Sequence, residues 1–159
     1  MSTEINLLFV CMGNNCGSPT AEAVFKHYVE QAGLAGRIVS DSAGTHDYHI
    51  GDPPDARAQQ AALDRGYDMS RLRGRQVTAS DFAEFDYVLA MDESNLHLLK
   101  ADCPPGHAHK IMFLMEYSDK PGRRNVPDPY YGGPQGFEQV LDMVEHAAQG
   151  LLRHIRERL

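Results

Sequence analysis

Two cysteines, two glycines and two asparagines lie close together in residues 11–18, which read Cys-Met-Gly-Asn-Asn-Cys-Gly-Ser. Gly13 and Asn14 are of the types that adopt left-handed backbone conformations, so this segment can turn its N–H groups toward one point. A strand before it and a helix after it would make the segment a cradle for an anion, because a helix N-terminus attracts negative charge. The same dipoles favour a thiolate, which makes Cys11 a candidate nucleophile.

Both cysteines of this segment also have a plainer interpretation. Free cysteine is often a small buried hydrophobe, so Cys11 could simply end a buried strand. For Cys16 the pattern favours a packing residue within the loop over any redox role. The residues of the loop alone leave the role of Cys11 open.

The flanking residues predict the elements that would position this loop. Residues 5–10 are nearly all apolar, which is typical of a strand buried on both faces. Ser18 and Pro19 are suited to the N-cap and first position of a helix over residues 19–32, with Gly33 after its end.

The rest of the chain alternates between strand-like and helix-like segments. Strands are predicted at 38–44, 87–90 and 110–114, and helices at 55–65, near Phe82, at 92–100 and at 137–159. Thr78 and Asp81 fit a capping box for the helix near Phe82. The order predicts an α/β fold: a three-layer, doubly wound, four-stranded parallel sheet with helices on both faces. Ligands of such sheets bind beyond the carboxyl ends of the strands, where the 11–18 loop begins.

Composition narrows the class of protein. The 159 residues suit one domain, 1–159, and 15 Lys plus Arg against 22 Asp plus Glu give a net charge of −7. That balance argues against a nucleic-acid partner, and no apolar run is long enough to predict a membrane partner. Three cysteines and no signal-peptide pattern predict a cytoplasmic location. The eight histidines show no ligand spacing, so we expect neither a metal nor a cofactor.

The 11–18 segment resembles the phosphate-binding loop of the low-molecular-weight protein tyrosine phosphatases, whose pattern is CxxGNxCRSP. It matches at Cys11, Gly13, Asn14, Cys16, Ser18 and Pro19. The resemblance continues, in family order, through residues 41–45, 51–55, 75–78, 90–95 and 128–132. It therefore covers nearly the whole chain.

The resemblance implies hydrolysis of phosphotyrosine through a phosphocysteine on Cys11, with Asp128 as general acid and then general base. Tyr48, Tyr130 and Tyr131 would flank the aromatic ring of the substrate. The implied phosphate-binding residues are Met12, Gly13, Asn14, Asn15, Cys16, Gly17 and Ser18. The implied ligands are a phosphotyrosine protein and inorganic phosphate or another oxyanion, and the chain is expected to be a monomer or a weak homodimer.

Two positions depart from the family pattern. Gly17 stands where the family has an arginine that grips two phosphate oxygens, and residues 5–20 contain no charge at all. Leu72 stands where a histidine usually supports the loop asparagine, so Asn14 is expected to be less firmly held; Asn15 is a smaller change from an apolar residue. Arg71 or Arg73 could reach inward instead.

These departures leave competing hypotheses. One is a phosphatase whose activity is much weakened by Gly17 and Leu72. The alternative is a non-catalytic pseudophosphatase that keeps the cradle and binds a phospho-ligand or a protein partner. A thiol-dependent arsenate reductase of the same fold is disfavoured, because no relay cysteine lies between Cys16 and Cys103.

Overall fold

A computed structural model describes residues 4–119, 124–129 and 133–159. Its centre is a sheet of four parallel strands in the order β2–β1–β3–β4, which confirms the predicted architecture. The strands are β1 (Ile5–Cys11), β2 (Ile38–Gly44), β3 (Tyr87–Ala90) and β4 (Ile111–Phe113). The strand order reverses direction between β1 and β3, so a crevice is expected beyond the carboxyl ends of these two strands.

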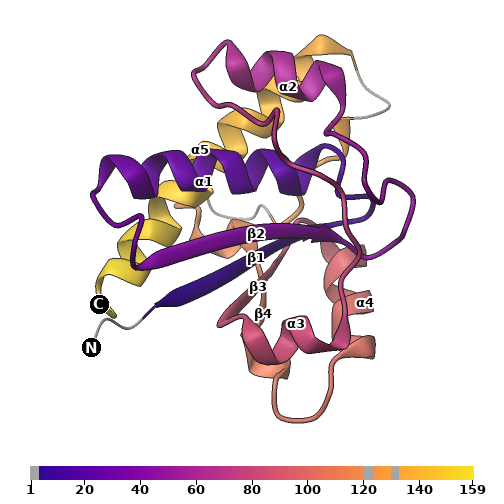
Figure 1. Cartoon of the computed structure of the whole chain (residues 1–159), viewed down its shortest axis with the longest axis vertical. Helices are drawn as coiled ribbons and strands as arrows, with labels where there is room; N and C mark the ends of the chain where they lie inside the picture. The colour runs from indigo at the N-terminus through magenta and orange to yellow at the C-terminus, as the bar shows by residue number, and fades with distance from the viewer. Residues whose placement is uncertain (1–3, 120–123, 130–132) are drawn as a thin grey trace.

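Helices cover both faces of the sheet (Figure 1). On one face lie α1 (Gly17–Gln31), α2 (Ala56–Leu63) and α5 (Pro134–Arg156), and on the other lie α3 (Ala79–Glu84) and α4 (Glu93–Asp102). Two 3₁₀ turns, Ala108–Lys110 and Leu114–Tyr117, flank β4. The three-layer arrangement follows from the parallel strands, because each crossover helix must return over a face of the sheet.

Strand β1 is buried on both sides, as its apolar sequence predicts. Leu7 and Phe9 pack into the larger core beneath α1 and α5, while Leu8 and Val10 pack into the smaller core beneath α3 and α4. The Phe9 and Phe25 rings meet edge to face, 5.7 Å apart, and join β1 to α1. Alternate side chains of one strand thereby anchor both helical layers.

Several element boundaries differ from the predicted ones by a few residues. Helix α5 begins at Pro134, whose fixed φ suits the first helical position, and ends at Arg156. Strand β4 is shorter than predicted because Leu114 starts a 3₁₀ turn. Helices α2 and α4 begin one residue later than predicted, since Asp55 and Asp92 are their N-caps.

Candidate active site

The loop between β1 and α1 turns sharply at Asn14. Its φ of 54° lies in the left-handed region, and within the described ranges no other non-glycine residue has a positive φ. Helix α1 then begins at Gly17 with Cys16 as its N-cap. The prediction that Ser18 caps the helix is therefore wrong: Ser18 and Pro19 lie inside the first turn, where a proline costs no intrahelical hydrogen bond. The Ser18 hydroxyl instead faces back into the loop.

The sulfur of Cys11 sits at the end of β1 between two hydrogen-bonding groups. The backbone N–H of Asn14 donates to it at 3.2 Å, and the Ser18 hydroxyl oxygen lies 3.0 Å away. Ser18 accepts a hydrogen bond from the Asn14 amide at 2.9 Å, and its own proton can reach the sulfur or, at 3.4 Å, the Ala43 carbonyl. Two donors aimed at one sulfur stabilise negative charge there, as a thiolate nucleophile requires.

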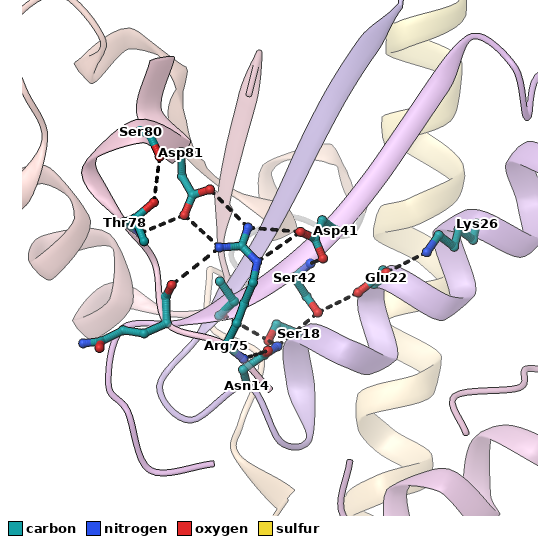
Figure 2. Close-up of polar contacts among 12 residues, drawn as sticks. Asn14, Ser18, Glu22, Lys26, Asp41, Ser42, Arg75, Thr78, Ser80 and Asp81 are labelled. Carbon is teal, nitrogen blue, oxygen red and sulfur yellow. Dashed lines mark hydrogen bonds and ion pairs between the residues drawn. The ribbon is translucent and has the colours of Figure 1, made fainter. Parts of the chain in front are cut away.

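The side chain of Asn14 is held on every side (Figure 2). Its amide nitrogen donates to the hydroxyls of Ser18 and Ser42 at 2.9 and 3.0 Å, and its oxygen accepts the backbone N–H of Arg75 at 3.0 Å. Asn14 thus has three side-chain hydrogen bonds, none of which involves Leu72. Leu72 packs against the larger core, and Arg75 supplies support from the neighbouring chain segment.

Behind Asn14 the hydrogen-bonded chain continues into helix α1. The Ser42 hydroxyl donates to the carboxylate of Glu22 at 2.7 Å, and Lys26 donates to the other carboxylate oxygen at 2.7 Å. Glu22 is only 3% exposed. A buried carboxylate requires such partners, because an unpaired charge in the interior is costly.

On the other side of the loop, the guanidinium of Arg75 bridges two carboxylates. It reaches Asp41 at 3.0 Å and Asp81 at 3.0 Å. Asp81 also accepts the backbone N–H of Thr78 at 2.8 Å, the contact that the predicted capping box requires. Burial lowers the pKa of Arg75, but its bonds to Asp81 and Asp41 outweigh burial and raise it. Arg75 is thus a cation behind the loop that is held in place by ion pairs with two carboxylates.

A pocket of about 260 Å³ opens beside Cys11 at the carboxyl ends of β1 and β3. It is lined by Cys11, Met12, Gly13, Asn15, Cys16, Gly17, Tyr48, His49, Met91, Asp92, Asn95, Val126, Pro127 and Asp128. Most of the predicted site residues are therefore brought together around one cavity. Asn14 and Ser18 are buried behind the loop and shape it, while Tyr130 and Tyr131 lie outside the described residues.

The predicted acid and the predicted aromatic wall lie at the mouth of this pocket. Asp128 is exposed there, on a segment pinned to the rest of the fold by Val126, whose N–H donates to the carbonyl of Met91 at 2.8 Å. Tyr48 is 61% exposed and stacks on His46, with ring centroids 5.0 Å apart and planes 13° apart. An exposed, oriented ring is suited to a flat aromatic substrate.

Some lining residues were not foreseen from the sequence. Met91, Asp92 and Asn95 follow the carboxyl end of β3, and the rule that ligands bind at that edge of a sheet could have found them. His49 is close in sequence to Tyr48, but no local pattern indicates that its side chain reaches the pocket. Val126 and Pro127 come with Asp128 on one segment.

Gly17 is the residue at which a side chain would enter the pocket beside the nucleophile. A Cβ placed there would lie 3.4 Å from Cε of Met91 and 3.9 Å from Cβ of Cys11. The backbone has ordinary helical geometry at this position, so a larger residue fits with a small movement of the Met91 side chain. Glycine is thus not required by the fold here.

Neither arginine suggested as a substitute reaches the pocket. Arg73 is exposed and donates to the carbonyls of Ser70 and Leu72 at 2.9 and 2.7 Å. Arg71 lines a separate hollow with Lys26 and Tyr67. In the described part of the chain, no lysine or arginine lines the pocket beside Cys11.

Cys16 lines the pocket but is only 5% exposed. Burial is the main reason that the pKa of its thiol is raised well above the usual range, and the nearby Asp55, Asp128 and Cys11 add to this. Cys16 is therefore protonated at neutral pH, which fits the predicted packing role better than a redox role.

The described ranges contain no candidate metal cluster and no candidate membrane span. No three His, Cys, Asp or Glu side chains there are grouped so as to hold a metal ion. No helix within those ranges combines the length and the apolar character that crossing a membrane needs.

Comparison with known proteins gives one consistent result. A family model described as low molecular weight phosphotyrosine protein phosphatase matches residues 6–159. A protein of Synechocystis named as a low molecular weight protein-tyrosine-phosphatase is 47% identical over 156 residues, covering 98% of this chain and 99% of that protein. The human low molecular weight phosphotyrosine protein phosphatase is 42% identical over 149 residues, covering 92% and 93%.

Solved structures agree. The protein tyrosine phosphatase of Entamoeba histolytica, crystallised with Hepes in the active site, has a TM-score of 0.93 and 40% identity over 97% of this chain and 98% of that chain. YfkJ from Bacillus subtilis has a TM-score of 0.92 and 36% identity over 98% and 97% of the two chains.

Proposed function

The chain belongs to the low molecular weight phosphotyrosine protein phosphatase family, and on that premise we propose that it hydrolyses phosphotyrosine monoesters through a phosphocysteine on Cys11. By family it is a protein-tyrosine-phosphatase, a phosphoric monoester hydrolase. The observation that carries the proposal is the Cys11 sulfur. It is held by Asn14 and Ser18 on the floor of a pocket that Asp128 also lines.

In the first step the Cys11 thiolate attacks phosphorus in line with the leaving oxygen. The new S–P bond forms as the P–O bond to the tyrosine breaks, and Asp128 gives its proton to the departing oxygen. The N-terminus of α1 stabilises the phosphoryl group that is transferred to Cys11. Its first helical hydrogen bond runs from Thr20 to the Cys16 carbonyl, so the preceding N–H groups have no partner within the helix and can face an anion.

In the second step water attacks the phosphocysteine. Asp128, now a carboxylate, accepts a proton from the water, the S–P bond breaks, and phosphate leaves with Cys11 again a thiolate. The Ser18 hydroxyl assists this second step, because a hydrogen bond to the sulfur makes it a better leaving group. Tyr48, exposed at the mouth, is the proposed contact for the tyrosine ring.

We expect this activity to be weak because of Gly17. An arginine that meets the phosphoryl group contributes about 10³–10⁵ in rate, and no side chain projects from position 17. The same observation favours a second candidate function: a non-catalytic module that binds a phospho-ligand in the pocket without turning it over. The retained Cys11 and Asp128 favour catalysis over this second candidate.

Hydrolysis of p-nitrophenyl phosphate separates the two candidates. The native protein, C11S and G17R are compared at equal concentration, with G17A as the matched control that adds a Cβ without a charge. We expect slow turnover by the native protein, none by C11S, no gain in G17A and a gain of at least about 10³-fold in G17R. If the native protein and C11S are equally inert while phosphate still binds, the non-catalytic function is correct.

A further inference from the structure

We propose that His49, oriented by Asp52, is a phosphate-contacting residue that supplies the positive charge missing at position 17. The inference rests on the proposed function, namely that the pocket beside Cys11 takes a phosphoryl group. It concerns a residue that neither the sequence pattern nor the comparisons assign to the reaction.

The imidazole of His49 faces the phosphate-binding loop. His49 lines the pocket, and its ring lies against Gly13, one of the loop residues. A Cβ built on Gly13 would be 3.0 Å from Cδ2 of His49 and 3.7 Å from Nε2. The absence of a side chain at Gly13 is therefore what lets the Nε2 edge of the ring come close to the loop.

Asp52 lies against the edge of the His49 ring that carries Nδ1. Its carboxylate lies 3.3 Å from Nδ1 of His49, and because a carboxylate only accepts hydrogen bonds, Nδ1 must donate to it. The ring is thereby held with Nε2 on the opposite edge, beside Gly13. In such an Asp–His pair, Nε2 donates to a second anion only when the ring carries a proton on both nitrogens.

The backbone that carries this pair is fixed by Gly74. Asp52 donates to the carbonyl of His49 at 3.0 Å, and Gly74 exchanges hydrogen bonds of 2.9 Å with Asp52 and Gly51. A Cβ at Gly74 would overlap the His49 carbonyl, so the close approach requires glycine. The next residue, Arg75, holds Asn14, and one short segment therefore positions both the loop and the histidine.

The charged side chains that line the pocket also support a role for His49 in contacting phosphate. Of its described lining side chains, Cys11, Asp92 and Asp128 can be negative in the proposed reaction, and His49 alone can be positive. When Nε2 carries a proton, the imidazolium lies between the carboxylate of Asp52 and a phosphate dianion beside the loop, and it can donate to both. The resulting charge-assisted hydrogen bond would supply part of the interaction that a bidentate arginine makes with phosphate.

Binding of inorganic phosphate to the full chain, measured by calorimetry, tests the inference. We expect H49A to bind phosphate about tenfold more weakly than the native protein, the lower end for a hydrogen bond to a charged group. D52N should weaken binding about two- to threefold, since the ring is kept but no longer fixed. H109A, which removes an exposed histidine on the far 3₁₀ turn, should bind as the native protein does.

A spectroscopic readout separates a contact from a structural role. In ¹⁵N-labelled native protein, phosphate should shift the Nε2 resonance of His49, and D52N should reduce this shift without changing the urea midpoint. If H49A binds phosphate as tightly as the native protein, or Nε2 does not respond, the inference is wrong while the proposed function stands. If the native protein neither binds phosphate nor hydrolyses p-nitrophenyl phosphate, the proposed function fails, and the inference fails with it.

Discussion

The side-chain oxygen of Asn14 accepts the backbone N–H of Arg75 at 3.0 Å, across 61 residues of sequence. This contact joins the phosphate-binding loop to a segment that is itself clamped to Asp41 and Asp81. Asn14 can then hold its left-handed backbone conformation, and its own N–H stays aimed at the Cys11 sulfur. Reactivity at Cys11 thus depends on contacts made far from it in the chain.

Replacing Asn14 tests this dependence. N14A loses the three side-chain hydrogen bonds and places alanine at a φ of 54°, so we expect a loss of about 2–4 kcal/mol in the free energy of unfolding. N14G loses the same bonds but tolerates the φ, and should be less destabilised than N14A. Urea unfolding measures both. Equal stability of N14A and the native protein would show that the three bonds contribute nothing.

Removing the cation behind the loop should also destabilise the fold. R75A leaves Asp81, which is 4% exposed, without its ion pair, and we expect a loss of about 2–3 kcal/mol. R75K should recover only part, because one ammonium cannot bridge two carboxylates as the guanidinium does. R73A, on the exposed neighbour, is the matched control and should unfold within about 0.5 kcal/mol of the native protein. A comparable loss in R73A would contradict this assignment.

Asp55 should make the free energy of unfolding decrease at acidic pH. Burial raises the pKa of this carboxyl, but hydrogen bonds from the Arg57 side chain and from the N–H groups of Arg57 and Ala58 outweigh burial and lower it. A lowered pKa in the folded state means that the stabilisation is present at neutral pH and is lost as the pH falls below about 4. D55N keeps an N-cap side chain but loses its charge, so it should be less stable than the native protein at pH 7 by about 0.3–1 kcal/mol.

Urea unfolding of the native protein and D55N at pH 7 and pH 2.5 measures that difference. The gap in stability should narrow at the lower pH, because protonation of Asp55 removes the charge that the folded state stabilises. A gap of the same size at both values would mean that the charge of Asp55 does not contribute to the folded state.

The two loop cysteines should differ in reactivity. Burial, with Asp55, Asp128 and Cys11 nearby, raises the pKa of the Cys16 thiol, whereas Cys11 is half-buried at the pocket floor. Iodoacetamide at pH 7.5 should modify Cys11 and leave Cys16 intact until urea is added, as fragmentation of the modified peptide would show. C11S provides the control. Alkylation of Cys16 in folded C11S at the rate seen for Cys11 would contradict the burial argument.

Tyr48 should act on the aromatic part of the substrate and leave the phosphate unaffected. Y48A is expected to raise the KM for phosphotyrosine about 2- to 12-fold, the range of one aromatic stacking contact. Its affinity for inorganic phosphate should stay at the native value. A parallel loss of phosphate affinity would place Tyr48 in the phosphate site rather than at its mouth.

Local sequence patterns were sufficient to predict the frame of the molecule. The apolar residues 5–10 and the alternation of strand and helix segments report on burial within single elements, and together they predicted the parallel sheet and its layers. The loop residues from Cys11 to Ser18 were likewise recognisable, because glycine and asparagine have backbone preferences that do not depend on the rest of the chain.

What the sequence by itself determined, then, is where the anion cradle and its cysteine lie in the fold, and that position 17 offers no side chain. The tertiary structure decided how these parts are held: Ser18 serves the sulfur rather than the helix cap, Arg75 supports Asn14 despite Leu72, and His49 enters the pocket. Each of these contacts joins segments that are distant in sequence or redirects a side chain by packing. Periodicity and propensity are local quantities, so only the folded chain could reveal them.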